Sequence, residues 1–138
     1  MRSSAGRFLA VDDNPDSAAL ASRVAERCGY ETRSECDPSA VVGVVEAWRP
    51  DIISLDLCMP QMDGIELLKE LIKCDYNGEI IFISGQTDAL VHLAAKLAEA
   101  KGLSVIASLT KPIRVATLRE KLTGSVQATP EYCQAAAN

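Results

Sequence analysis

Carboxylates stand directly after two short apolar runs of this chain. Asp12 and Asp13 follow a run that ends at Val11, and Asp56 closes the run of residues 51–56. A carboxylate is costly to bury without a partner, so we expect these acids at the open carboxyl ends of strands. In a doubly wound α/β sheet, ligands bind at that edge.

Two further apolar runs end in groups of different chemistry. Ser84 follows residues 80–83, and Lys111 comes shortly after residues 103–109. Because the carboxyl ends of neighbouring parallel strands meet at one edge, we expect three acids, one hydroxyl and one ammonium to lie together.

This set of groups favours metal-assisted phosphoryl chemistry. Two carboxylates about 4 Å apart repel by roughly 4 kcal/mol at an effective dielectric near 20, so three together need a cation. Mg²⁺ fits best, because it binds one or two carboxylates and keeps waters and phosphate oxygens. One acid can then act as a nucleophile toward phosphorus, while Lys111 and Ser84 share the negative charge of the transferred group.

The rest of the chain alternates strand patterns with helical ones. Apolar runs predict strands near residues 7–11, 51–56, 80–83 and 103–109, and a weakly alternating segment at 30–34 predicts an edge strand. A helical pattern follows each of these segments. We expect the first helix to bury the stripe Leu20, Val24 and Cys28, the fourth to carry its apolar pattern on Leu90, Leu93 and Leu97, and Asn77-Gly78 to end the third. Without hairpin signals, five such units predict a parallel sheet with helices on both faces.

Composition limits the class of protein. The chain has 138 residues and a net charge of -5, which suits one compact domain and argues against nucleic acid as a direct partner. No apolar run reaches the roughly 18 residues that span a membrane, and the N-terminus lacks a secretory leader, so we expect a cytoplasmic protein. The five cysteines include no Cys-x-x-Cys pair and are expected to be free thiols.

These motifs together resemble the receiver domain of bacterial two-component response regulators. The resemblance covers residues 6–123 and rests on Asp12-Asp13, Asp56-x-x-Met59-Pro60-x-Met62-Asp63-Gly64, Ser84-Gly85 and Lys111-Pro112. It implies a flavodoxin-like α/β fold with strand order 2-1-3-4-5. We place the domain at residues 1–126 and a C-terminal tail at 127–138.

The resemblance also implies a metal site. Asp13 and Asp56 would ligate Mg²⁺ together with the backbone carbonyl of Cys58, and Asp12 would contribute through water. The side chain of Cys58 has no assigned part.

A role in phosphoryl transfer follows from the same likeness. Asp56 would accept a phosphoryl group from the phosphohistidine of a sensor histidine kinase or phosphotransfer protein. Lys111, through a cis Lys111-Pro112 bond, would pair with the phosphoryl oxygens, and Ser84 would move toward them, with Gly85 keeping that approach open.

Two features depart from the common receiver pattern. Many receivers carry an aromatic residue three positions before the lysine, where this chain has Ser108. The segment between Ser84 and Lys111 is longer than in chemotaxis-type receivers and is similar to receivers attached to EAL-type cyclic-di-GMP phosphodiesterases. His92, the only histidine, is interpreted as a surface residue on the fourth helix.

Three functions stay open at this level. The favoured one is a switch, not an enzyme, in which phosphorylation alters the surface of the fourth helix, fifth strand and fifth helix, for a downstream protein, a fused output domain or a homodimer. A phosphatase with an aspartyl intermediate is the second, although that class carries Asp-x-Asp after one strand and this chain has the adjacent pair Asp12-Asp13. An adaptor whose acidic site is never phosphorylated is the third.

Overall fold

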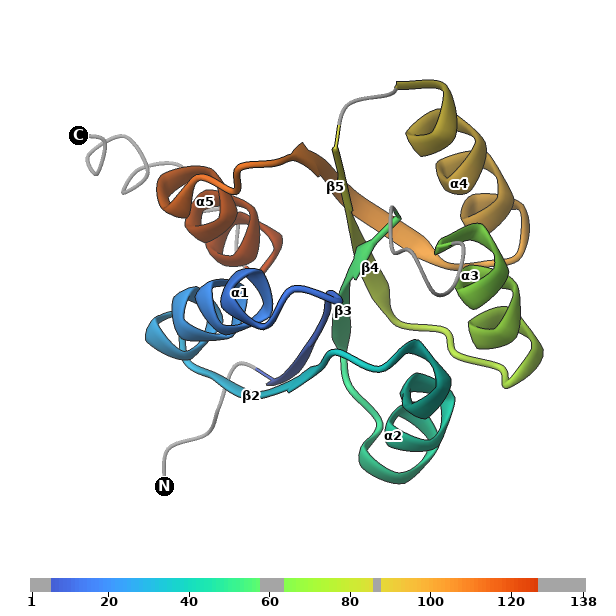
Figure 1. Ribbon diagram of the computed structural model, residues 1–138, viewed down its shortest axis with the longest axis horizontal. Coiled ribbons are helices and arrows are strands. Elements are labelled where there is room, and N and C mark those ends of the chain that lie inside the picture. The colour runs from blue at the N-terminus through green and yellow to red at the C-terminus, as the bar shows by residue number, and fades with distance from the viewer. Residues whose placement is uncertain (1–5, 58–63, 86–87, 127–138) are drawn as a thin grey trace.

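The computed structural model describes residues 6–57, 64–85 and 88–126, and it contains a five-stranded parallel sheet (Figure 1). The strand order is β2-β1-β3-β4-β5, which confirms the predicted flavodoxin-like arrangement. The strands are β1 (Gly6–Val11), β2 (Tyr30–Glu35), β3 (Ile52–Asp56), β4 (Glu79–Ser84) and β5 (Ser104–Thr110).

Helices cover both faces of this sheet. Figure 1 shows α1 and α5 on one face and α2, α3 and α4 on the other. Their bounds are α1 (Pro15–Arg27), α2 (Val41–Trp48), α3 (Gly64–Lys73), α4 (Asp88–Ala100) and α5 (Val115–Val126), and a short 3₁₀ turn, η1 (Pro38–Ala40), precedes α2. Among the described segments, no helix has the length and apolar character needed to cross a membrane.

The sheet separates two hydrophobic cores. Alternate residues of β4 serve different faces, so Ile80 and Phe82 join the core under α2, α3 and α4, whereas Ile81 and Ile83 join the core under α1 and α5. All four side chains are buried, as expected for a strand covered on both sides. Burying side chains of this size contributes about 1.5–3 kcal/mol each, which fixes the central strands.

The buried faces of two helices consist mainly of smaller side chains than those that mark the sequence pattern. Leu20 of α1 and Cys28, which follows α1, are only partly buried, and Leu93 of α4 is 56% exposed. Small side chains take the core positions, and they are Ala18, Ala21, Val24 and Ala25 in α1 and Ala94 and Ala98 in α4. The stripe predicted for α1 is confirmed at Val24, which is buried, and Leu20 and Cys28 pack against the same core from partly exposed positions, while alanines fill most of the fully buried positions.

Local backbone conformation sets some helix ends. α3 ends at Lys73, before the predicted stop at Asn77, because Asp75 adopts a left-handed conformation with φ of 64°. At η1, the Asp37 side chain accepts a hydrogen bond from the Ser39 backbone N–H and so caps the turn that begins at Pro38.

The only tryptophan of the chain lies at the amino ends of the strands. Trp48 has the guanidinium carbons of Arg7 and Arg33 at 5.5 Å and 5.0 Å from its ring centroid. Arg7 also donates a hydrogen bond to the Trp48 carbonyl. These contacts attach α2 to β1 and β2, and cation–π pairs of this kind contribute about 0.5–1 kcal/mol each at exposed sites.

Candidate functional site

Strand register brings the predicted polar residues to one edge of the sheet. Val11 pairs with Leu55, so Asp12 and Asp56 each follow a paired position. Ser84 pairs with Thr110, and its carbonyl accepts a 2.9 Å hydrogen bond from the Lys111 backbone N–H. The ends of β1, β3, β4 and β5 therefore present their side chains together.

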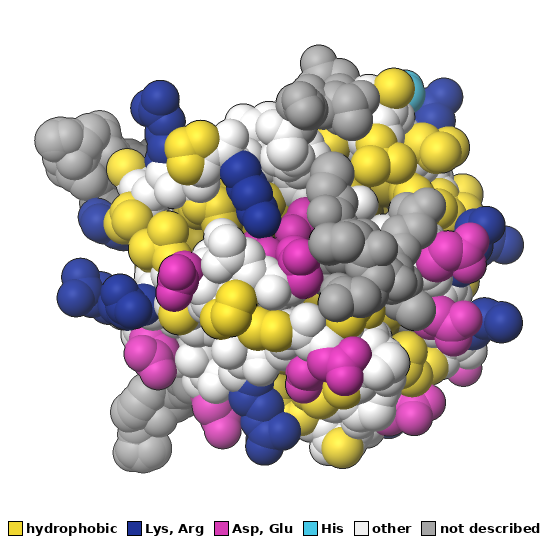
Figure 2. Space-filling view, viewed as in Figure 1, with side chains coloured by type: hydrophobic (Ala, Val, Ile, Leu, Met, Phe, Trp, Pro, Cys, Tyr) yellow, Lys and Arg dark blue, Asp and Glu magenta, His cyan; other side chains and the backbone are white. Residues whose placement is uncertain are grey.

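The three acids form a compact cluster at this edge. Asp12, Asp13 and Asp56 each offer a carboxylate oxygen, and these atoms lie within 4.8 Å of one another. Asp12 is 3% exposed and Asp56 is 1% exposed, whereas Asp13 is half-buried. In Figure 2, Asp and Glu side chains gather near the middle of the face, with a Lys or Arg side chain beside them.

Lys111 lies between two of these acids. Its Nζ is 3.2 Å from Asp56 Oδ2 and 3.2 Å from Asp12 Oδ2, and the Lys111-Pro112 bond is cis. Burial acts to lower the pKa of Lys111, but the hydrogen bonds and charges of Asp56 and Asp12 together outweigh it and raise that pKa. Lys111 is therefore a firmly charged ammonium.

The surroundings of Asp12 disfavour its ionised form. Burial raises the pKa of its carboxyl, the hydrogen bond from the Asn14 backbone N–H at 2.9 Å opposes this, and the charge of Asp56 raises it further. Asp12 Oδ2 is buried and, although close to Lys111 Nζ, makes no well-directed hydrogen bond to any described residue.

The charges at this edge suit a divalent cation. Three carboxylates and the single ammonium of Lys111 leave an excess of two negative charges if all groups are ionised. The donors are hard oxygen atoms, one of them a buried oxygen that lacks a hydrogen bond, and such donors are the ligands that Mg²⁺ prefers. Mg²⁺ therefore fits the residues present.

Comparison with known proteins identifies the family of this chain. The model of the response regulator receiver domain matches residues 8–123. The chain belongs to the response regulator receiver family. It is 32% identical over 100 residues to the chemotaxis protein CheY of Thermotoga maritima, a match that covers 72% of this chain and 83% of that protein.

Two further comparisons give the same result for this receiver. It is 29% identical over 116 residues to sporulation initiation phosphotransferase F of Bacillus subtilis, covering 83% of this chain and 88% of that protein. The crystal structure of a response regulator from Colwellia psychrerythraea is 32% identical, with a TM-score of 0.77, and the match covers 91% of this chain and all of the other.

Ser84 brings an available hydroxyl to the edge of the receiver sheet. It is 1% exposed, and its Oγ has no hydrogen-bond partner within the described segments. At the neighbouring Gly85, a Cβ would meet no heavy atom within 4 Å. Alanine would therefore fit at position 85 as well, and steric room there does not depend on glycine.

Gly64 allows a close contact between α3 and β3 that the sequence did not predict. The sequence pattern indicated only a turn and a helix start there. A Cβ on this first residue of α3 would lie 2.9 Å from the Leu57 carbonyl oxygen and 3.0 Å from its carbon. Glycine thus lets α3 begin against the end of β3, next to Asp56. Cys58, whose backbone carbonyl is a predicted metal ligand, and residues 59–63 of the motif lie outside the described residues.

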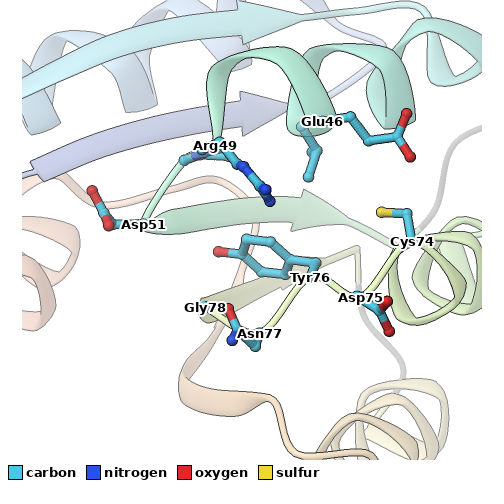
Figure 3. Close-up of a pocket in the computed structure, with 10 residues that line it drawn as sticks. Glu46, Arg49, Asp51, Cys74, Asp75, Tyr76, Asn77 and Gly78 are labelled. Carbon is cyan, nitrogen blue, oxygen red and sulfur yellow. The ribbon is translucent and has the colours of Figure 1, made fainter.

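A separate pocket lies at the opposite end of the receiver sheet (Figure 3). It has a volume of about 330 Å³ and is lined by Arg49, which follows α2, and by Cys74 and Tyr76, which follow α3. Burial raises the pKa of the Cys74 thiol and of the Tyr76 phenol, so both stay protonated at neutral pH and neither is an activated nucleophile. The acidic edge is therefore the better candidate for chemistry.

Proposed function

We propose that this receiver is a phosphorylation-dependent switch whose phosphoacceptor is Asp56. A carboxylate oxygen of Asp56 attacks the phosphorus of a phosphohistidine on a sensor histidine kinase or phosphotransfer protein. The new O–P bond makes an acyl phosphate as the P–N bond to the imidazole breaks, and the imidazole leaves with the electron pair of that bond. The protein acts as a phosphoacceptor and not as a catalyst of turnover.

Mg²⁺ is the cofactor that we propose for this step. Asp13 and Asp56, with the backbone carbonyl of Cys58, would hold the ion directly, and Asp12 would do so through water. When bound, Mg²⁺ supplies positive charge that offsets the carboxylates and the incoming phosphoryl oxygens.

Lys111 and Ser84 have complementary parts in this proposal. Lys111 Nζ already lies 3.2 Å from Asp56 Oδ2, so a short movement places its ammonium beside a phosphoryl oxygen bonded to that carboxylate. The buried Ser84 hydroxyl, which lacks a described partner, gains a strong acceptor when a phosphoryl group arrives. Phosphorylation therefore draws β4 and β5 toward Asp56.

One observation carries the proposal: Asp56 is almost fully buried at a strand end, with a lysine ammonium at 3.2 Å and two further carboxylates within 4.8 Å. Incubation with Mg²⁺ and acetyl phosphate is expected to add one phosphoryl group, detected by intact-protein mass spectrometry. Asp56→Asn abolishes the addition, and chelation of Mg²⁺ does the same.

Asp16→Asn is the matched control, because Asp16 is an exposed acid in the first turn of α1. This variant is expected to take up phosphoryl as the parent does. Equal uptake by Asp56→Asn overturns the proposal. Absence of Mg²⁺-dependent uptake in the parent supports the adaptor, and sustained hydrolysis of a phosphomonoester supports the phosphatase.

The proposal also includes the surface through which the phosphorylated receiver would act on a partner. We place the responsive surface on α4, β5 and α5, where Leu93 is 56% exposed and a pocket of about 360 Å³ is lined by Ser108, Thr110 and Thr117. Many receivers carry an aromatic side chain at the position of Ser108. With serine there, this receiver cannot signal phosphorylation through the movement of an aromatic ring at that position. A downstream protein, a fused output domain of the EAL type or a second copy of the chain would bind this surface, in the cytoplasm.

A further inference from the structure

The pocket at the amino ends of the strands has the size of a small-molecule site. Its volume is about 330 Å³, and pockets that bind small ligands usually measure about 300–1,000 Å³. One wall comes from the end of α2 and the turn into β3, and the other from residues 74–78, between α3 and β4 (Figure 3). None of the lining residues belongs to the acidic edge.

The Tyr76 side chain forms a fixed wall of this pocket. Its phenol donates a 3.0 Å hydrogen bond to the Glu79 carbonyl, and its backbone N–H donates one of 3.0 Å to the Leu71 carbonyl. A Cβ at Gly78 would collide with the phenol, so glycine is what lets the ring lie against this turn. The ring is held before any ligand arrives, and a pre-formed wall reduces the ordering that binding would otherwise require.

Arg49 is the basic group of the pocket. Figure 3 shows its side chain extending from the end of α2 toward the Tyr76 ring, and the Cys74 thiol pointing into the space between the two walls. Among the described residues, Arg49 forms no ion pair. Its guanidinium therefore offers a fork of N–H donors, the geometry that suits the carboxylate of a ligand.

Two carboxylates flank the pocket near Cys74. Burial raises the pKa of the Cys74 thiol, and the charges of Glu46 and Asp75 raise it further, so both acids lie close enough to act on this part of the pocket. Neither acid forms an ion pair in the part of the chain that the structure describes. The third acid, Asp51, is already engaged, because its Oδ2 accepts a 2.8 Å hydrogen bond from the Arg7 backbone N–H.

The ends of α2 and α3 add negative potential at the same place. Arg49 lies one residue past the end of α2, and Asp75 lies two residues past the end of α3. Carbonyl groups at a helix C-terminus carry a partial negative charge, which favours a cation within about one turn. The pocket thus combines one guanidinium with a region that attracts positive charge, and a ligand that carries both charges satisfies the two.

We propose that this pocket binds a zwitterionic amino acid with an apolar side chain. Its carboxylate accepts a pair of hydrogen bonds from Arg49, and its ammonium is held by Glu46 and Asp75 at the ends of the two helices. Its side chain packs against Val45 and Pro50, the buried apolar residues of the lining. The site lies at the other end of the sheet from the acidic edge, and it does not require phosphorylation.

The test titrates the full, unphosphorylated chain with L-leucine in the absence of Mg²⁺. Isothermal titration calorimetry is expected to give a dissociation constant of about 1 mM or lower, and NMR amide shifts are expected at Asn77 and Gly78. Isoamylamine lacks the carboxylate of leucine and isocaproate lacks its ammonium, so each is expected to bind about tenfold or more weakly. This outcome is independent of whether Asp56 accepts a phosphoryl group.

One pair of variants tests the basic side. Arg49→Gln is expected to weaken leucine binding about tenfold or more, because the bidentate contact to the carboxylate is lost. Arg23→Gln makes the same charge change at an exposed position of α1 and is expected to leave the affinity within about twofold.

A second pair tests the acidic side. Glu46→Gln with Asp75→Asn is expected to weaken leucine binding about fivefold or more, and asparagine tolerates the left-handed backbone at position 75. Glu99→Gln with Glu120→Gln makes the same change in net charge at exposed positions and is expected to leave binding within about twofold. Circular dichroism verifies that each variant is folded.

Several results would overturn the proposal. Absence of any heat or amide shift with L-leucine does so, and so does equal binding of isoamylamine or isocaproate, since a single charge would then suffice. An unchanged affinity in Arg49→Gln, or an equal loss in Arg23→Gln, would show that the guanidinium in the pocket does not hold the ligand.

Discussion

At the scale of single residues, the acidic edge combines burial with repulsion. The pKa of Asp12 is raised mainly by burial, so its ionised form is less favourable in the folded protein than in the unfolded chain. The folded state then loses stability as the pH rises from the ordinary value of 3.8 through the raised pKa. A metal ion at this edge would reverse the penalty.

We expect Asp12→Asn to stabilise the metal-free protein at pH 7 by about 1 kcal/mol, the usual scale for a buried polar group. Urea unfolding in the presence of a chelator measures this. The gain should disappear below pH 3.8, where the carboxyl of the parent is also protonated in both states. A variant that is less stable at pH 7 would show that the ion pair with Lys111 outweighs the cost of burial.

The sequence predicted that the polar residues at the strand ends lie together, but it did not predict which of their side chains interact. Each of Asp12, Asp56, Ser84 and Lys111 follows an apolar run, and parallel topology then brings them to one edge. The interaction of Lys111 with both Asp12 and Asp56 depends on where a four-carbon side chain turns in three dimensions, and no sequence pattern encodes that.

At the scale of secondary-structure elements, close packing is achieved through small residues. The spacing of apolar residues located every helix and placed Leu20, Val24 and Cys28 on the core face of α1, but it emphasised large aliphatic side chains and missed the alanines that are buried most fully. An alanine side chain needs little room, so it fits at fully buried helix positions that apolar periodicity alone does not distinguish. The contact between Gly64 and Leu57 is another case that periodicity cannot show.

Two glycine substitutions test the packing argument with opposite signs. Gly64→Ala is expected to destabilise the protein by about 1–3 kcal/mol, because its Cβ would collide with the backbone of Leu57. Gly43→Ala, within α2 and with nothing near its added Cβ, is expected to stabilise by about 0.5–1 kcal/mol through helix propensity. Chemical denaturation measures both, and equal shifts would refute the packing assignment.

At the scale of the whole molecule, one sheet joins the two cores. Neighbouring residues of β4 face opposite sides, so the loss of either core exposes one face of the strands on which the other core also depends. This arrangement predicts a single unfolding transition, in which anything that stabilises the acidic edge stabilises both layers of helices.

Mg²⁺ at about 100 times its dissociation constant is therefore expected to add about 2.7 kcal/mol to the free energy of unfolding. Hydrogen exchange in 0.15 M salt should slow in both cores, for example at the amides of Phe8 and Phe82. Asp13→Ala should remove most of this gain and Asp12→Ala less of it. Protection confined to the acidic edge would contradict a single cooperative unit.

The position of Trp48 gives the protein a built-in optical reference. Its indole lies between Arg7 and Arg33, at the strand ends remote from Asp12 and Asp56. The fluorescence emission of Trp48 should change on denaturation, when the two guanidinium groups move away from the indole. It should stay constant when a ligand binds at the acidic edge. A single unlabelled sample can thus distinguish loss of the fold from a change of signalling state.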